Sequence, residues 1–359
     1  MSATPAVVLA VSELAPPRAA AMFAAVASRN RAAVSDLLRQ TLAERPRGVS
    51  ELLLSRAAVV LRDDPFGQQR FSSATPVHLA SFLGSLATLR EMILALKRSC
   101  SDTGSATDVG RVVGSLCDGC TSAAHLAAWG GDHAECLELV CGAGCDVSQR
   151  RASGATVLYI AAARGFTRCV RAALALGASP RAAHKVGGIT PVMIACEHGH
   201  AESVAALLSS DPALASCPDN DGCPPLSRVL EMQQDASALP IVRILLGMGA
   251  DPTTSASSFK QGQEPGLSLE QASSTTPGRS QPARVEDADC AIHTAAELGR
   301  PACLEALLDS VVLAGMPPSS GVDVRGGARW TPLMMASLHG HDACVRVCLD
   351  RGANVNARV

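Results

Sequence analysis

A short pattern that recurs along the chain constrains the fold more than any other feature of the sequence. The pattern begins with Thr-Pro or a close variant and ends with Ala five residues later. Full copies start at positions 75, 156, 190, 290 and 331, and weaker copies start at Ser122 and Pro224. The starts at 122, 156, 190 and 224 are each 34 residues apart. A tandem unit of this length predicts a stack of similar small units, each of which contacts its neighbours.

Each unit has the sequence signals of two short helices. Thr can cap the first helix, Pro fits its first turn, and a glycine such as Gly165 or Gly199 ends it. Apolar residues at helical spacing, such as Val204, Leu207 and Leu208, then give a second helix one buried face. Asp-Gly or Gly-Gly pairs follow and predict a tight, finger-like turn. Because one unit cannot bury its own apolar face, stacked neighbours must cover it.

These residues, with segments such as Gly177-Ala-Ser-Pro180 and Gly249-Ala-Asp-Pro252, resemble the ankyrin-repeat family. The resemblance covers about residues 75 to 359, apart from an insert. It implies an all-α solenoid of stacked helix-turn-helix units with short β-hairpin fingers. It also implies a non-enzymatic scaffold or adaptor whose protein partner binds the concave face made by the fingers and the first helices.

The repeat starts predict four regions. They are 1–74, an N-terminal region with a degenerate capping repeat and an extra helix; 75–254, about five repeats; 255–285, a disordered low-complexity insert; and 286–359, two repeats ending in an incomplete finger. In the first region, Val34, Leu37 and Leu38 match the second-helix pattern, and Val49 to Leu61 is expected to be the extra helix. The insert is rich in Ser, Gln, Pro and Gly, which disfavours a packed core.

Charge and composition narrow the function classes. A net charge of −2 argues against a general nucleic-acid binder, which usually has a basic surplus. No apolar run near the start approaches the roughly 20 residues that span a bilayer, and no secretory signal is evident. The 14 cysteines are therefore expected to be reduced thiols of an intracellular protein, cytoplasmic or alternatively nuclear. The sequence gives no indication of oligomeric state.

Eight of the nine histidines, all except His184, and four of the 14 cysteines recur at fixed positions of the unit. Cys196-Glu-His-Gly-His200 has ligand types that zinc prefers, but His339 and His341 occupy the same places in another unit. A metal ligand should be singular, whereas a structural residue should recur, so no metal site is predicted. Four cysteines fall at one position of the second helix and are expected to be small core residues. They are Cys136, Cys169, Cys303 and Cys344.

Cys117-Asp-Gly-Cys120 is the sharpest chemical motif in the chain. A Cys-x-x-Cys pair can bind zinc or act as a redox couple. Its Asp-Gly, however, matches Asp221-Gly222 at the finger turn, and no second Cys-x-x-Cys exists to complete four ligands. A structural turn is the favoured interpretation, and a thiol redox or metal protein is a weaker alternative. The chain contains no phosphate loop, nucleophile elbow or His-Glu-x-x-His, so no catalytic residue or cofactor is predicted.

The finger tips contain the candidate partner-binding residues. They are Arg150 and Arg151 in one finger, His184 and Lys185 in the next, and Arg325, Arg329 and Trp330 near the last. Basic side chains there suggest an acidic or phosphorylated segment of a partner, whereas the simpler alternative is charge that is merely solvated. Trp and Arg are enriched among residues that dominate binding energy.

A second function remains open from the sequence. The chain could recruit substrates to an enzyme complex such as a ubiquitin ligase. That role needs a docking element outside the repeats, for which residues 39–74 and 255–285 are the available segments.

Overall fold

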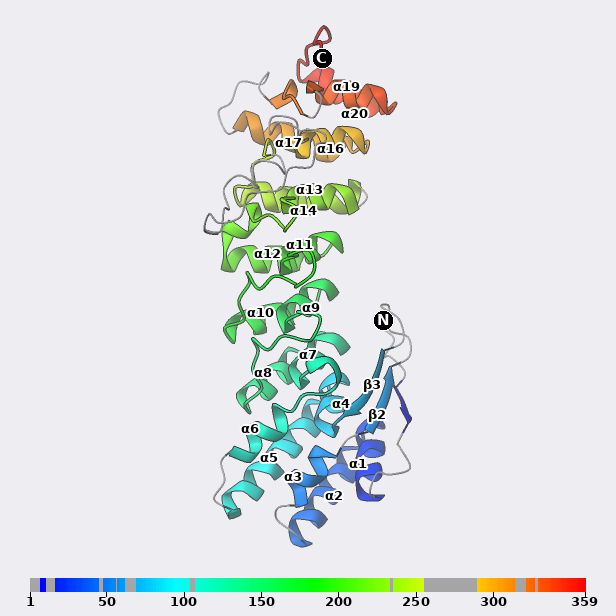
Figure 1. Cartoon of the computed structure of the whole chain (residues 1–359), viewed down its shortest axis with the longest axis vertical. Helices are drawn as coiled ribbons and strands as arrows, with labels where there is room; N and C mark the ends of the chain where they lie inside the picture. The colour runs from blue at the N-terminus through cyan, green and yellow to red at the C-terminus, as the bar shows by residue number, and fades with distance from the viewer. Residues whose placement is uncertain are drawn as a thin grey trace, which may run out of the picture. The chain divides into compact units, whose positions relative to one another are not determined.

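The computed structural model consists of two compact units, residues 1–186 and 187–359, which are described separately (Figure 1). The structure describes residues 7–10, 17–44, 48–55, 57–61, 69–103, 107–232, 235–254, 289–313, 321–326 and 329–359. The insert predicted at 255–285 lies outside the described residues.

The first unit begins with helices and a small sheet. Helices α1 (Pro17–Ala27) and α2 (Arg31–Glu44) form a pair, followed by α3 (Gly48–Leu54). Strands β1 (Val7–Ala10), β2 (Ala57–Leu61) and β3 (Gln69–Ala74) form an antiparallel sheet in the order β1-β2-β3. The prediction of one helix from Val49 to Leu61 was therefore wrong beyond Leu54.

The sheet explains that error. In β2, Val59 and Val60 are β-branched residues, which favour strands over helices. Val60 is opposite Val8 of β1 and Arg70 of β3, so the strand is paired on both sides. Strand pairing between segments that lie far apart in the sequence cannot be detected from the local spacing of apolar residues.

Three helix pairs of the repeat follow in the first unit. They are α4 (Pro76–Phe82) with α5 (Leu86–Thr103), α7 (Ala123–Gly130) with α8 (Ala134–Gly142), and α9 (Val157–Arg164) with α10 (Thr167–Ala175). Helix α6 (Thr107–Val113) and the short η1 (Asp118–Cys120) lie between the first two pairs. The first helices α4, α7 and α9 pack in one layer, and the second helices α5, α8 and α10 pack in another.

The second unit repeats this arrangement four times. Its pairs are α11 (Pro191–Glu197) with α12 (Ala201–Ser210), α13 (Pro225–Met232) with α14 (Asp235–Gly247), α16 (Ala291–Glu297) with α17 (Pro301–Leu313), and α19 (Pro332–Leu338) with α20 (Asp342–Asp350). The short η2 (Pro212–Ser216) follows α12. First helices again pack on first helices and second on second. The predicted stack of helix-turn-helix units is confirmed.

The start of each first helix is fixed by the residues that define the repeat. Hydroxyl oxygens at the cap accept a hydrogen bond from the backbone N–H three residues later, at 3.2 Å for Thr156 and 3.4 Å for Thr331. In three units a histidine completes the cap: His78, His125 and His293 accept the cap residue's own N–H on Nδ1. A hydroxyl cap of this kind stabilises a helix by about 1 kcal/mol.

His293 also connects neighbouring units. His293 Nε2 lies 3.0 Å from the Val324 carbonyl oxygen and 3.2 Å from that of Trp330, at the base of the next finger. Because Nδ1 accepts a hydrogen bond, Nε2 has the ring proton and donates it to these carbonyls. The histidines therefore have a recurring structural role, as their spacing predicted.

The predicted core cysteines are buried. Cys136, Cys169, Cys303 and Cys344 are each at most 2 % exposed, on the second helices α8, α10, α17 and α20. Burial raises the pKa of the Cys136 thiol to about 11. A buried thiol with a raised pKa is a poor nucleophile, so these cysteines act as small apolar residues.

Candidate functional site

The fingers share one backbone geometry. Four of the described fingers close with a hydrogen bond from a backbone N–H to the carbonyl four residues later, for example at 2.9 Å from Arg151 to Ala155 and 3.0 Å from Gly326 to Trp330. In five units the residue three positions before the first helix lies in the left-handed region. That position is held by Cys120 (φ 58°), Gly154 (φ 94°), Gly188 (φ 65°), Gly222 (φ 81°) and Arg329 (φ 62°).

The Cys117–Cys120 motif is one of these turns. The Cys117 N–H donates to the Thr121 carbonyl at 2.8 Å, and Cys120 occupies the left-handed position. Cys117 is buried, Cys120 is exposed, and the two are not joined by a disulfide. This geometry supports the structural interpretation of the motif. Among the described residues, no group of three or more His, Cys, Asp or Glu side chains is placed to hold a metal ion.

Two predicted partner-binding arginines hold the fingers together. Arg150 Nη1 donates to the carbonyl of Ala183 at 2.7 Å and to that of Gly154 at 3.3 Å. Arg325, at the equivalent position of its unit, donates to the carbonyls of Arg358 at 2.9 Å and Arg329 at 3.2 Å. Each arginine therefore spans its own finger and the following one, a role that the sequence did not reveal.

The remaining predicted residues differ in their surroundings. Arg329 is exposed, and Trp330 beside it is half-buried with its carbonyl engaged by His293 and Gly326. Lys185 is exposed, with Nζ 3.5 Å from the Ala152 carbonyl.

The finger that contains Asp219, Asn220 and Asp221 is organised around a buried carboxylate. Asp219 is 7 % exposed and accepts hydrogen bonds from the N–H groups of Asp221 and Cys223 at 2.9 and 2.8 Å. Arg228 binds its second oxygen through Nε at 3.0 Å and through Nη2. The charge of Asp219 is thus used inside the unit and is not displayed to a partner.

Arg151 and His184 come together in one cavity of the first unit, which we call the Trp129 pocket. Its volume is about 210 Å³. It is lined by Trp129, Arg151, Ser153, Ala155, Tyr159, Ile160, Ala163, Arg164 and His184. Trp129 comes from α7 and Tyr159 and Arg164 come from α9, whereas Arg151 and His184 come from fingers. The pocket therefore lies between first helices and fingers.

Cationic and aromatic groups are paired in this pocket. The guanidinium carbon of Arg151 lies 4.7 Å from the centroid of the Trp129 ring, and that of Arg164 lies 5.4 Å from it. The His184 ring stacks on Tyr159 with centroids 5.1 Å apart and an interplanar angle of 29°. Such contacts restrict the cations and reduce the entropy that a ligand must remove on binding.

Arg151 lacks an acidic partner. Its Nε donates to Thr121 Oγ1 at 3.0 Å, and no carboxylate among the described residues lies within ion-pair distance of it. Burial lowers the pKa of this guanidinium because the charged form loses contact with water. A half-buried cation without a counter-ion can gain free energy by pairing with an anion from another molecule.

Sequence reasoning placed Arg151 and His184 in this region but missed Trp129, Tyr159 and Arg164. A usable signal was present. Tyr159 occupies the repeat position of His78, His125 and His293, and the chain has only nine aromatic residues. Unlike those buried histidines, Tyr159 is half-buried and lines the cavity.

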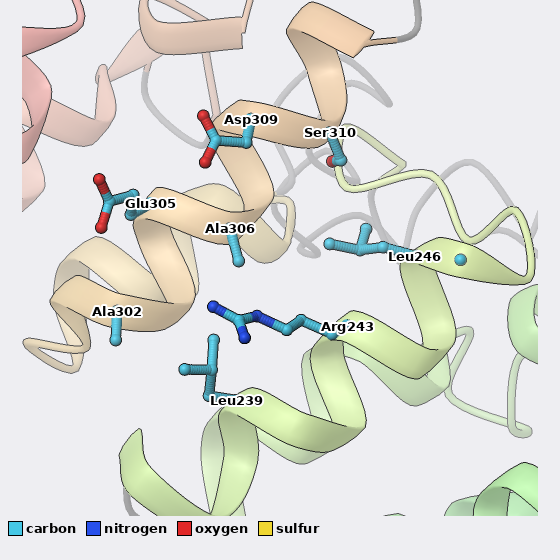
Figure 2. A pocket seen from close by; sticks show the side chains of 9 residues that line it. Leu239, Arg243, Leu246, Ala302, Glu305, Ala306, Asp309 and Ser310 are labelled. Atoms are coloured by element: carbon cyan, nitrogen blue, oxygen red, sulfur yellow. The ribbon is translucent and has the colours of Figure 1, made fainter.

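A second hollow lies in the other unit, between the second helices α14 and α17 (Figure 2). Its volume is about 570 Å³, and Figure 2 shows Arg243 reaching into the space between the two helices. Glu305 and Asp309 at its rim are both bound by Arg351, the former at 3.0 Å. Both carboxylates at its rim are therefore already paired within the unit.

Comparison with known proteins agrees with this architecture. A family model described as ankyrin repeats matches residues 124–216, 158–256 and 271–359. The crystal structure of the human ASB11 ankyrin repeat domain is 21 % identical, with a TM-score of 0.49, and the match covers 76 % of this chain and 98 % of that one. The ankyrin repeat domain of Bcl-3 is 22 % identical, with a TM-score of 0.48, covering 66 % and 88 % respectively. Among the described residues, none of the helices combines the length and apolar character needed to cross a membrane.

Proposed function

The chain belongs to the ankyrin-repeat family, and on this basis we propose that it is a non-enzymatic scaffold or adaptor that binds a protein partner between its fingers and first helices. Ankyrin repeats are general protein–protein interaction domains. The observation that most directly supports a location is the half-buried Arg151, which lies over Trp129 without a carboxylate partner among the described residues.

The proposed partner is an acidic or phosphorylated segment. Arg151 and Arg164 line one small cavity, and exposed Lys185 lies on the adjacent finger. A hydrogen bond from a guanidinium to an anion is worth about 1.5–3 kcal/mol, roughly twice a neutral one. Arg and Trp together in a partly desolvated cavity are typical of the few residues that dominate an interface.

The other candidate residues receive different roles in this proposal. Arg150 and Arg325 position the fingers, because their guanidinium groups donate to backbone carbonyls of two fingers. His184 shapes the pocket wall through its stacking on Tyr159. Arg329 and Trp330 form a separate candidate surface in the second unit.

A site-specific cross-linking experiment tests this proposal. A photo-reactive amino acid replaces Ser153 at the pocket, and in a matched chain it replaces Glu138 on the second helix α8. The cross-linked partner segment is identified by mass spectrometry, and its affinity is measured for the full chain and for Arg151→Gln. Arg171→Gln is the control, since Arg171 is an exposed arginine on the second helix α10 of the same unit.

We expect cross-links from position 153 and at least a tenfold weaker affinity for Arg151→Gln, with Arg171→Gln unchanged. Cross-links from position 138 alone, or equal affinity for all three chains, would contradict the proposed location.

A further inference from the structure

The Trp129 pocket places two cations on one aromatic ring with one cavity in front of them. Both guanidinium carbons lie within 5.4 Å of the Trp129 centroid, and both side chains line the same space of about 210 Å³. Both guanidinium groups therefore border the space that a small ligand group would enter. A ligand group in this space can accept hydrogen bonds from either guanidinium.

The size of the cavity limits that ligand to one side-chain end. About 210 Å³ is less than the roughly 300–1,000 Å³ of pockets for drug-sized molecules. An entire helix of a partner does not fit, whereas a single charged side chain does. The recognised group is thus small and anionic.

The aromatic walls further narrow the choice. The face of Trp129 is contacted by Arg151 and Arg164, and Tyr159 is stacked with His184. An incoming ligand group therefore contacts the cationic side chains rather than uncovered aromatic rings. An aliphatic side chain that ends in an oxyanion matches this arrangement better than an aromatic one.

Charge and geometry distinguish phosphate from carboxylate. A phosphate monoester has a charge of about −1.5 to −2 near pH 7 and three acceptor oxygens. An aspartate or glutamate has one charge and two oxygens. Planar guanidinium groups each offer a fork of donors, so two of them match a dianion with several oxygens. We infer that the Trp129 pocket receives a phosphoserine or phosphothreonine side chain of the partner, so that phosphorylation of the partner switches binding on.

This inference rests on the proposed function and adds the chemical class of the recognised group. Arg151 is the principal contact, because it has no acidic partner among the described residues and is already oriented by Thr121. The affinity of an isolated phosphoamino acid should be weak, in the millimolar range, because the remaining interface is absent.

The test measures binding of small blocked amino acids to the full chain. The probes are N-acetyl-phosphoserine methylamide, N-acetyl-aspartate methylamide and dimethyl phosphate, a monoanionic diester. Trp330→Phe leaves Trp129 as the single tryptophan, so that its fluorescence reports binding at the pocket. The same titrations use Arg151→Gln, Arg164→Gln and the control Arg171→Gln, and circular dichroism verifies that each variant is folded.

We expect saturable binding of the phosphoserine probe at low salt, at least tenfold tighter than that of the aspartate probe. Arg151→Gln and Arg164→Gln should each weaken it at least tenfold, and Arg171→Gln should not. Equal binding of the aspartate or diester probe would overturn the phosphate inference and leave the proposed acidic-segment interaction in place. Absence of any phosphoserine binding would also overturn it, whereas the cross-linking experiment from position 153 tests the protein-binding function independently of phosphate.

Discussion

The buried His125 makes the stability of the first unit depend on pH. Its side chain is fully buried at the start of α7, and Nδ1 accepts the Ser122 N–H at 3.2 Å. Burial lowers its pKa from 6.5 to about 4, and the nearby Arg151 and His78 charges act in the same direction. The backbone carbonyls of Ala155 and Gln149 oppose this decrease only in part.

The sign and size of the effect follow from linkage. Because the pKa is lower in the folded state, the unfolded chain binds the proton more readily. The stabilising contribution is complete above pH 6.5 and is lost as the pH falls toward 4. At 1.36 kcal/mol per pKa unit, the full loss is about 3 kcal/mol, of which about 2 kcal/mol is gone at pH 5.

The assay compares urea unfolding of Trp330→Phe with that of Trp330→Phe/His125→Gln between pH 8 and pH 5. Trp129 is then the single tryptophan and lies on α7, the helix that His125 caps. This local reporter matters because repeat stacks can unfold in parts. Glutamine does not titrate, so we expect the free energy of unfolding to fall about 2 kcal/mol less in the double variant. Parallel pH dependences of the two chains would refute the reasoning.

Three further predictions concern the repeat framework. Arg329→Gly removes a side chain from a left-handed backbone position and should raise the free energy of unfolding by about 0.5–1 kcal/mol in thermal denaturation. A lower free energy of unfolding would show that the arginine side chain stabilises the turn. Gly299→Ala and Gly340→Ala both place a side chain at a positive φ, but only at Gly299 does the new Cβ lie 2.6 Å from a histidine ring. In urea unfolding, Gly299→Ala should therefore lower the free energy of unfolding by about 1 kcal/mol or more beyond the loss in Gly340→Ala. Equal losses for the two variants would contradict this packing argument. Asp219→Ala should lower the free energy of unfolding by about 3–5 kcal/mol, because it leaves Arg228 without its main partner. Asp221→Ala, on the exposed turn, should lower it by less than about 0.5 kcal/mol. Similar losses for the two variants would mean that the Asp219 contacts contribute little.

The helix pairs were predictable because their signals are local. A Thr or Ser cap, a proline in the first turn and a glycine after the helix each act within one unit, and the period repeats them. The N-terminal sheet was not predictable in this way. Strand β2 pairs with β1, some 50 residues earlier, and its five residues alone read equally well as the end of a helix.

The Trp129 pocket was predictable only in part. The fingers were chosen because they lie between the repeat units, where a partner is expected, so Arg151 and His184 were among the candidate residues. Trp129 and Arg164 lie on first helices, where residues were considered mainly for the core. Their surface role depends on which side of each helix meets a finger, and that follows from packing rather than from the period.

Arg150 and Arg151 show how recurrence separates framework from recognition. Arg150 has an equivalent in Arg325, and both donate to the same two carbonyl positions of two fingers. Identical contacts in these two units indicate a structural role for an arginine at this position. The position of Arg151 is instead held by Lys185 in the next finger and by Gly326 near the end of the chain. A position that varies between units can be adapted to a partner, and in this chain it holds a half-buried guanidinium beside a tryptophan.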